Sequence, residues 1–276
     1  TRREQGLLRG ELTLLDRQLQ RLEHKVLRLA VFGRVGVGKS SLINALVGQR
    51  LLETDVAHGS TRRQQAVTWP LKLDGLQKVE LIDTPGIDEI DAAGRTRLAT
   101  RVAMGVDLVL LVIDSDLTRC DRDALETLQA SGKPVRLVLN RSDRWPEEQL
   151  PELLASIRSR LPSDLPLTAV AAAPRQPMLD ADGRVRSSAA PTRVSNLKQQ
   201  LIDQFQREGE LLLALQSLRQ ADRCKQERRH VRWRHHRRSA QGLIGRYAAT
   251  KATAVAVNPL MALDLAGGLA CDTGLV

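Results

Sequence analysis

Aromatic residues are almost absent from this sequence of 276 residues, since three Trp, one Tyr and two Phe make up only 2% of it. A hydrophobic core must therefore be built mainly from Leu, Val, Ile and Ala. The hydrophobic content of 42% and the charged content of 27% are typical of a globular chain rather than a disordered one. A chain of this length can bury one sizeable α/β core and still hold accessory segments.

Cysteine is also scarce, because the sequence has only Cys120, Cys224 and Cys271. They lie far apart and share no metal-ligand spacing, so we interpret them as free thiols of a reducing, cytoplasmic compartment. An initiating Met, a signal peptide and a transit segment are absent as well. The sequence stops directly after an apolar stretch, at Gly274-Leu275-Val276, and we interpret these ends as truncations.

The net charge of +10 is distributed unevenly. Residues 1–26 hold 6 Lys/Arg and 4 Asp/Glu, residues 27–173 hold 19 of each, and residues 174–276 hold 17 against 9. The neutral middle section is therefore not a general polyanion binder. The basic character belongs to the last hundred residues.

The first 26 residues are expected to form an amphipathic helix. Its apolar residues alternate at spacings of four and three, which is a heptad seam; they are Leu8, Leu12, Leu15, Leu19, Leu22 and Val26. We expect this helix to pack on its own domain or on another helix of the chain. Self-association of two copies through the seam is the alternative.

Residues 27–173 alternate strand and helix patterns and are expected to form one α/β domain. Apolar runs at 26–32, 107–113 and 135–139 predict buried strands, and 167–170 predicts a short one. Helical patterns cover 41–47, 121–131 and 147–160, and Asp74-Gly75 predicts a hairpin between 65–73 and 78–82. The expected fold is a mostly parallel sheet with one antiparallel strand and helices on both faces.

A glycine-rich motif, Gly33 to Ser40, follows the first strand and opens the first helix of that domain. It matches G-x-x-x-x-G-K-[ST], whose backbone N–H groups surround phosphates at a helix N-terminus. Lys39 should reach the β- and γ-phosphates, and the Ser40 hydroxyl should bind Mg²⁺. The nucleotide-binding residues expected here are Gly33, Arg34, Val35, Gly36, Val37, Gly38, Lys39, Ser40 and Ser41.

Asp83-Thr84-Pro85-Gly86 ends the strand that follows the hairpin turn. At that place in a P-loop fold, Asp83 is expected near Mg²⁺, and the backbone N–H of Gly86 is expected at the γ-phosphate. A hydroxyl is also needed to close over the metal. Thr61 is our choice, with Ser60 as the alternative, in a polar loop that should order around a triphosphate and loosen without it. Lys39, Thr61 and Gly86 are thus the expected catalytic groups.

The segment Asn140-Arg141-Ser142-Asp143 predicts which base is bound. A carboxylate at Asp143 can accept two N–H bonds from guanine, whereas adenine lacks those donors and would leave a buried charge unpaired. Asn140 should tie this loop to the phosphate loop, and the aliphatic stem of Arg141 can lie over the base. Ala172, after the last strand, is assigned to the base site where a serine is common. The expected ligands are GTP or GDP with Mg²⁺.

Together these motifs resemble the Era/TrmE-like branch of the translation-factor-related GTPases. The resemblance covers residues 27–173 and rests on the strings GRVGVGKSSLINAL, GSTRR, DTPG and NRSD. It implies hydrolysis of GTP by a molecular switch. The string AATKATAVAVNP near the end resembles a hydrophobic domain of unknown function fused to some bacterial, notably cyanobacterial, Era-like GTPases.

Three departures from the family pattern affect the expected mechanism. Ile87 stands where Ras-like GTPases have a water-orienting Gln, which implies slow intrinsic hydrolysis or help from another residue, a partner or a second protomer. Gly36 replaces the Asn of potassium-activated members, so K⁺ stimulation is not expected. No arginine finger can be assigned, although Arg34, Arg62 and Arg63 are nearby candidates.

After the α/β domain we expect a flexible linker at 174–192, a basic helical region at 193–247 and an apolar tail at 248–276. The run Arg228–Arg238 holds six Arg, three His and one Trp. An anionic membrane surface is the favoured partner of this run and the tail. One alternative is RNA, although the run lacks the interleaved aromatic residues that stack on bases. The other alternative is an ordinary solvated helix face. The tail itself is too polar to predict a membrane span.

Three functions therefore remain open. The first is a regulatory GTPase switch, cytoplasmic and peripheral at an inner or thylakoid membrane. The second is a dynamin-like membrane-remodelling GTPase, in which the helices before and after the nucleotide domain pair as a stalk. The third is an Era-like RNA- or ribosome-binding assembly factor.

Overall fold

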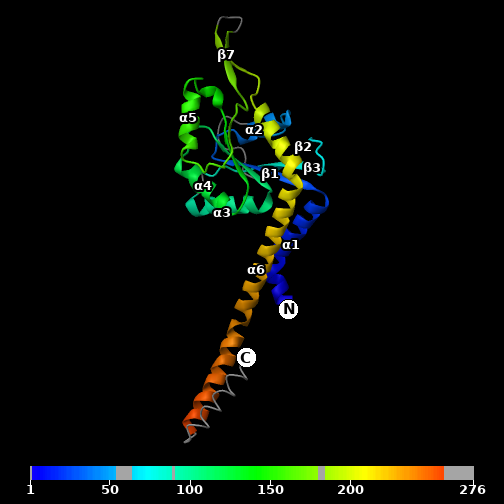
Figure 1. Ribbon diagram of the computed structural model, residues 1–276, viewed down its shortest axis with the longest axis vertical. Helices are drawn as coiled ribbons and strands as arrows, with labels where there is room; N and C mark the ends of the chain where they lie inside the picture. The colour runs from blue at the N-terminus through cyan, green and yellow to red at the C-terminus, as the bar shows by residue number, and fades with distance from the viewer. Residues whose placement is uncertain (1, 54–63, 89–90, 180–183, 258–276) are drawn as a thin grey trace. The chain divides into compact units, whose positions relative to one another are not determined.

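The computed structural model describes residues 2–53, 64–88, 91–179 and 184–257 (Figure 1). These residues form two compact units. The larger unit is Arg17–Arg219, and the smaller unit combines residues 1–16 with residues 220–276. Helices α1 (Arg2–Glu23) and α6 (Ser195–Val257) contribute to both units.

The larger unit is built on a six-stranded sheet in the order β2-β3-β1-β4-β5-β6. All neighbours are parallel except β2 and β3. The strands are β1 (Val26–Gly33), β2 (Gln65–Trp69), β3 (Lys78–Asp83), β4 (Leu108–Ile113), β5 (Val135–Leu139) and β6 (Leu167–Ala169). The hairpin predicted at Asp74-Gly75 is confirmed, since Gly75 adopts a positive φ of 78° between Leu73 and Leu76, which form a bridge.

Helices cover both faces of this sheet, as Figure 1 shows. The core on one face joins the sheet to α2 (Lys39–Val47) and to the first turns of α6. The core on the other face joins it to α3 (Ala92–Gly105), α4 (Arg119–Ala130) and α5 (Gln149–Arg158). The central strand β4 is buried along its whole length. The predicted mostly parallel sheet with one antiparallel strand is therefore confirmed.

The first part of α6 belongs to this core, which corrects the predicted boundary of the α/β domain at residue 173. Leu197 and Leu201 are fully buried, and Phe205 is 1% exposed. Phe205 packs edge-on against Trp69 of β2, with ring centroids 6.4 Å apart. The apolar stripe of this helix is therefore used to cover the sheet, and the domain needs it to bury that face.

The predicted linker at 174–192 contains a second, two-stranded sheet. Strand β7 (Arg175–Leu179) pairs antiparallel with β8 (Val185–Ala189), and both strands are largely exposed. The Ser, Ala and Pro content of this segment is typical of a linker, which is why no strands were predicted. The two strands nevertheless form, because pairing with each other satisfies their backbone hydrogen bonds without a hydrophobic core. Ala171 also bridges to Arg193, so the two ends of this segment lie together.

The last turns of α1 pack on the larger unit through polar side chains rather than through the predicted leucine seam. The Gln18 amide donates to the Ser217 hydroxyl of α6 at 3.2 Å, and Arg21 forms an ion pair with Asp107. Gln18 and Arg21 are buried, whereas Leu19 and Leu22 remain 46% and 36% exposed. The prediction that this helix packs on its own chain is confirmed, although the buried face is a different one.

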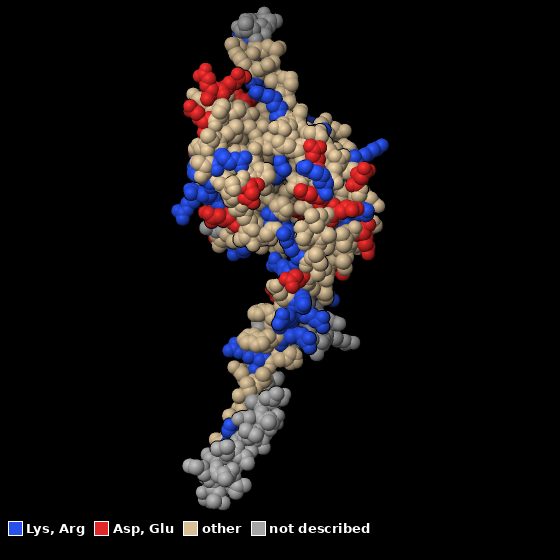
Figure 2. All heavy atoms as spheres, in the orientation of Figure 1, with Lys and Arg blue, Asp and Glu red and all other residues tan. Residues whose placement is uncertain are grey.

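The smaller unit contains the C-terminal half of α6, which runs ten residues beyond the predicted helix end at 247. Lys and Arg side chains gather along this part of the helix (Figure 2). Trp233 is 60% exposed, and the Arg237 guanidinium lies 5.3 Å from its ring centroid. No helix among the described residues is long and apolar enough to cross a membrane. Most of the predicted tail, residues 258–276, lies outside the described residues.

Candidate nucleotide-binding site

The phosphate loop connects the buried strand β1 to the first residue of α2. Gly38, just before α2, has a φ of 89°, and a Cβ there would lie 2.4 Å from the Asn140 side-chain amide. Glycine is required at this position both by the backbone conformation and by the close approach of a second loop. The loop therefore brings backbone N–H groups to the N-terminus of a nine-residue helix, where an anion is favoured.

Lys39 folds back over the phosphate loop. Its Nζ atom donates to the carbonyl oxygens of Gly33 at 3.1 Å and Arg34 at 2.7 Å, and the residue is only 7% exposed. The ammonium group is therefore held at the rim of the loop by main-chain oxygens. A nearby cation of this kind suits the β- and γ-phosphates of a bound nucleotide.

Ser40 and Asp83 bring a hydroxyl and a carboxylate together beside that loop. The Ser40 hydroxyl donates to Asp83 Oδ2 at 2.6 Å, and Asp83 is 1% exposed at the end of β3. Strand β3 is paired with β1, and this pairing places two residues that are far apart in sequence at the same edge of the sheet. Oxygen ligands of this kind fit Mg²⁺, which takes few protein groups and completes its shell with phosphates and water.

The Asp83-Gly86 segment also presses directly on the phosphate loop. A Cβ on Gly86 would lie 2.0 Å from Val35 Cγ2 and 2.7 Å from the Val35 nitrogen. The Val35 N–H donates to the Asp88 carboxylate at 2.6 Å. The Ile87 side chain is fully buried in the core with α3 and α4, so it points into the protein.

The predicted base-binding segment lies beside the phosphate loop. The Asn140 amide donates to the Val37 carbonyl oxygen at 2.8 Å, and its Oδ1 accepts from the Ala172 N–H at 3.1 Å. Asn140 is 2% exposed. One buried side chain thus joins the phosphate loop, the base segment and the loop after β6, as expected of Asn140. Asp143 follows in a short 3₁₀ helix (Ser142–Arg144) and is half-buried.

Arg34 was a candidate arginine finger, and the structure holds its guanidinium away from that role. It pairs with Asp114 at 3.1 Å and with Asp121 at 3.2 Å, and its side chain is 20% exposed. Arg141 pairs with the same Asp114 at 2.9 Å. The sequence analysis did not identify Asp114 as a site residue, because a single Asp after a strand matches no motif. Its position at the carboxyl end of β4, where ligands bind in open α/β sheets, was the one available signal.

The remaining predicted residues divide into two groups. Gly36 and Ser41 lie in the phosphate loop and in the first turn of α2, as expected. Ser60, Thr61, Arg62 and Arg63 lie outside the described residues. Within the described part of the chain, no group of three or more His, Cys, Asp or Glu side chains could hold a metal ion.

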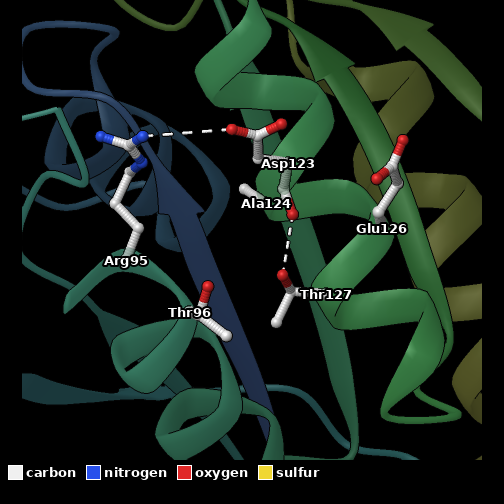
Figure 3. Close-up of a pocket in the computed structure, with 6 residues that line it drawn as sticks. All are labelled: Arg95, Thr96, Asp123, Ala124, Glu126 and Thr127. Atoms are coloured by element: carbon white, nitrogen blue, oxygen red, sulfur yellow. Dashed lines mark hydrogen bonds and ion pairs between the residues drawn. The ribbon is translucent and has the colours of Figure 1, made fainter. Parts of the chain in front are cut away.

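A cavity of about 230 Å³ lies elsewhere, between α3 and α4 (Figure 3). The Arg95 guanidinium faces the Asp123 carboxylate across it, 4.0 Å away. The lining residues are Arg95, Thr96, Asp123, Ala124, Glu126 and Thr127, none of which was predicted to bind a nucleotide. This cavity is therefore separate from the site formed by the phosphate and base loops.

Comparisons with known proteins agree with this geometry. Residues 28–141 match a family model described as 50S ribosome-binding GTPase, and residues 219–276 match a domain of unknown function, DUF697. The GTPase Der of Rhizobium johnstonii is 43% identical over 121 residues, which are 42% of this chain and 25% of Der. The GTPase Era of a Synechocystis species is 38% identical over 135 residues, 46% of this chain and 41% of Era. The matched part of this chain thus spans a quarter of Der and about two fifths of Era.

Solved structures show the same fold. Aquifex aeolicus Era bound to GDP and aluminium fluoride superposes with a TM-score of 0.51 at 22% identity, covering 65% of this chain and 56% of that one. A structure of Era with MgGDPNP and nucleotides 1506–1542 of 16S ribosomal RNA gives a TM-score of 0.50, also at 22% identity, with the same coverage. At this identity the likeness establishes the fold of the larger unit.

Proposed function

We propose, from the premise that residues 28–141 form an Era-like P-loop GTPase domain, that this protein binds GTP with Mg²⁺ and hydrolyses it to GDP and phosphate. The observation that supports this most directly is the double role of Asn140. Its amide holds the phosphate loop at Val37, and its oxygen holds the loop at Ala172. These contacts hold the two motifs side by side, which supports the proposal that both bind one nucleotide.

The chemistry follows from the groups around the phosphate loop. Water attacks the γ-phosphorus in line, a new P–O bond forms, and the bond to the β-phosphate oxygen breaks, so that GDP leaves with that electron pair. Lys39 and the N-terminal amides of α2 stabilise the charge on the transferring phosphoryl group. When Mg²⁺ is bound it neutralises charge on the β- and γ-phosphate oxygens, and the Ser40 hydroxyl, beside Asp83, would hold it.

Hydrolysis by the isolated protein is proposed to be slow. A buried Ile87 cannot orient water, and Arg34 is held by two carboxylates. The described residues therefore provide electrostatic stabilisation without a side chain that positions the nucleophile. A switch with slow turnover that a partner or a second protomer accelerates fits this arrangement.

Titration calorimetry with GDP, a GTP analogue and ATP in magnesium buffer tests nucleotide binding. We expect GDP and the analogue to bind and ATP not to compete. Phosphate release from GTP tests hydrolysis. Lys39→Ala should abolish it, because the substitution removes the ammonium group that lies at the phosphate loop. Equal competition by ATP, or no retention of guanine nucleotide at all, would overturn the proposal.

We further propose that the C-terminal half of α6 attaches the protein to an anionic membrane surface. Exposed Arg228, Arg229, Arg232 and Arg237 lie within ten residues, next to the exposed Trp233. Arginine attracts anionic headgroups, and Trp prefers the interface between lipid and water. The matched DUF697 segment includes this stretch, whose function the family description leaves open.

Flotation with phosphatidylglycerol-containing vesicles, compared with neutral vesicles, tests this attachment. We expect binding only to anionic vesicles, and loss of binding when Arg228, Arg229, Arg232 and Arg237 are all changed to Gln. The matched control removes four exposed arginines of the larger unit, namely Arg97, Arg101, Arg119 and Arg122. Binding to neutral vesicles with tubulation would favour a remodelling GTPase. Co-sedimentation with ribosomes and not with vesicles would favour RNA.

A further inference from the structure

One carboxylate connects the phosphate loop to the base-binding loop. Asp114 follows the last residue of β4, at the carboxyl edge of the sheet. Its Oδ1 accepts from Arg34 Nη2 at 3.1 Å, and its Oδ2 accepts from Arg141 Nη1 at 2.9 Å. The three side chains are only 20%, 20% and 32% exposed, so both ion pairs are partly shielded from water.

The Arg34 end of this connection is fixed a second time. Arg34 Nε donates to Asp121 at 3.2 Å, and the Asp121 side chain is fully buried. Asp121 also accepts from the Thr118 N–H and hydroxyl in the capping box that starts α4. The guanidinium is therefore held between the end of β4 and the start of α4, and Asp114 is oriented by a rigid neighbour.

The Arg141 end carries the base loop. Arg141 adopts a left-handed backbone with a φ of 59°, one of two such non-glycine residues in the described chain. This conformation costs about 1 kcal/mol for a residue with a side chain. It is held between Asn140, bonded to Val37, and Ser142, whose N–H donates to the Val170 carbonyl oxygen. Its guanidinium is fixed by Asp114, so its aliphatic stem must span the gap between the base loop and the end of β4.

We propose that Asp114 is a positioning residue for the nucleotide. It holds the stem of Arg141 in the orientation in which the stem covers the bound purine, and through Arg34 it keeps the base loop in register with the phosphate loop. This inference rests on the proposed guanine-nucleotide site. It explains how an arginine can occupy the second position of the base-binding segment Asn140–Asp143. The guanidinium group of an arginine favours a carboxylate partner, and Asp114 supplies one.

Release of a fluorescent GDP analogue tests this role, because a cover over the base acts on the dissociation rate. Asp114→Ala should release the analogue about tenfold faster, and Arg141→Ala should have an effect of similar size. The double variant should release it no faster than Arg141→Ala alone, since Asp114 acts through Arg141. Arg141→Lys, which keeps one charged contact, should lie between wild type and Arg141→Ala.

Asp116→Ala is the matched control. Asp116 lies two residues further along the same loop and forms its own ion pair, with Arg160. Its Oδ1 accepts from Arg160 and from the Leu117 N–H, contacts that involve neither Arg34 nor Arg141, so we expect release at the wild-type rate. Additive effects of Asp114→Ala and Arg141→Ala, or a rate unchanged by Asp114→Ala, would show that Asp114 has no positioning role while leaving the nucleotide site intact. A wild-type protein that retains no GDP analogue would overturn both the site and this inference.

Discussion

Gly86 lies so close to Val35 that no side chain fits between the two loops they belong to. A Cβ on Gly86 would meet Val35 Cγ2 at 2.0 Å and the Val35 Cα atom at 2.9 Å. The flexible end of the valine could move aside, but its backbone is part of the phosphate loop and cannot. The Asp83-Gly86 segment can therefore accommodate a side chain at Gly86 only by moving away from the phosphate loop.

Gly86→Ala should consequently separate hydrolysis from binding. The added methyl pushes the segment away from the γ-phosphate side, so we expect phosphate release to fall at least tenfold while GDP affinity stays within about threefold of wild type. Single-turnover phosphate release and calorimetry with GDP measure the two effects. Gly105→Ala is the control, since a Cβ there meets nothing within 4 Å. Equal loss of GDP binding and hydrolysis would contradict this view of Gly86.

Asp143→Asn should weaken the preference for guanine. In the proposed site the half-buried Asp143 carboxylate would accept two N–H groups of the guanine edge, whereas the amide of an asparagine could accept only one of them. A loss on the order of 1–3 kcal/mol corresponds to about 5- to 150-fold weaker GDP binding. Calorimetry with GDP and ADP measures the selectivity, with Asp164→Asn on the exposed surface as control. An unchanged GDP affinity would show that Asp143 does not contact the base.

Asn140→Ala should lower both stability and nucleotide affinity. The substitution leaves the Val37 carbonyl oxygen and the Ala172 N–H without their buried partner, at a cost of about 1–3 kcal/mol in the free energy of unfolding. It also frees the phosphate loop from the base loop, so nucleotide release should be faster. Urea unfolding without nucleotide and release of a GDP analogue measure the two effects. A stability equal to that of wild type would mean that water replaces the Asn140 contacts.

Lys133 should make stability depend on pH above neutrality. Its ammonium donates to the Val106 carbonyl oxygen, and burial lowers its pKa from 10.5 to about 7, with Arg219 and Arg21 adding to that shift and Asp107 opposing it. Between pH 7 and 10.5 the unfolded chain binds more protons than the folded one at this site, so its contribution to stability rises with pH.

Lys133→Met removes this titration. The free energy of unfolding of the wild type, relative to the variant, should rise from pH 7 to pH 9 by up to about 1.4 kcal/mol per pH unit. Urea unfolding at pH 7, 8 and 9 measures it. Parallel pH profiles of the two proteins would show that Lys133 keeps its proton in the folded state.

Local sequence patterns were sufficient for most of the sheet and for locating the two loops that we propose to bind the nucleotide. Buried strands such as β4 are continuous apolar runs, and the turn at Gly75 needs a positive φ that glycine adopts without strain. Helix α3 was not predicted. Its buried residues Ala99, Val102 and Ala103 are small and few, so its apolar stripe is weak, although Asp91 caps its N-terminus.

The sequence by itself determined the chemistry of the larger unit, because glycine, lysine, serine and asparagine at fixed short spacings dictate local backbone conformations and charges around a phosphate. Only the tertiary structure decided how those pieces cooperate. It placed the first turns of α6 in the core, turned polar residues of α1 inward instead of its leucines, and brought Asp114 between Arg34 and Arg141. These contacts join residues far apart in the chain, and their energies depend on burial and distance, which no short pattern encodes.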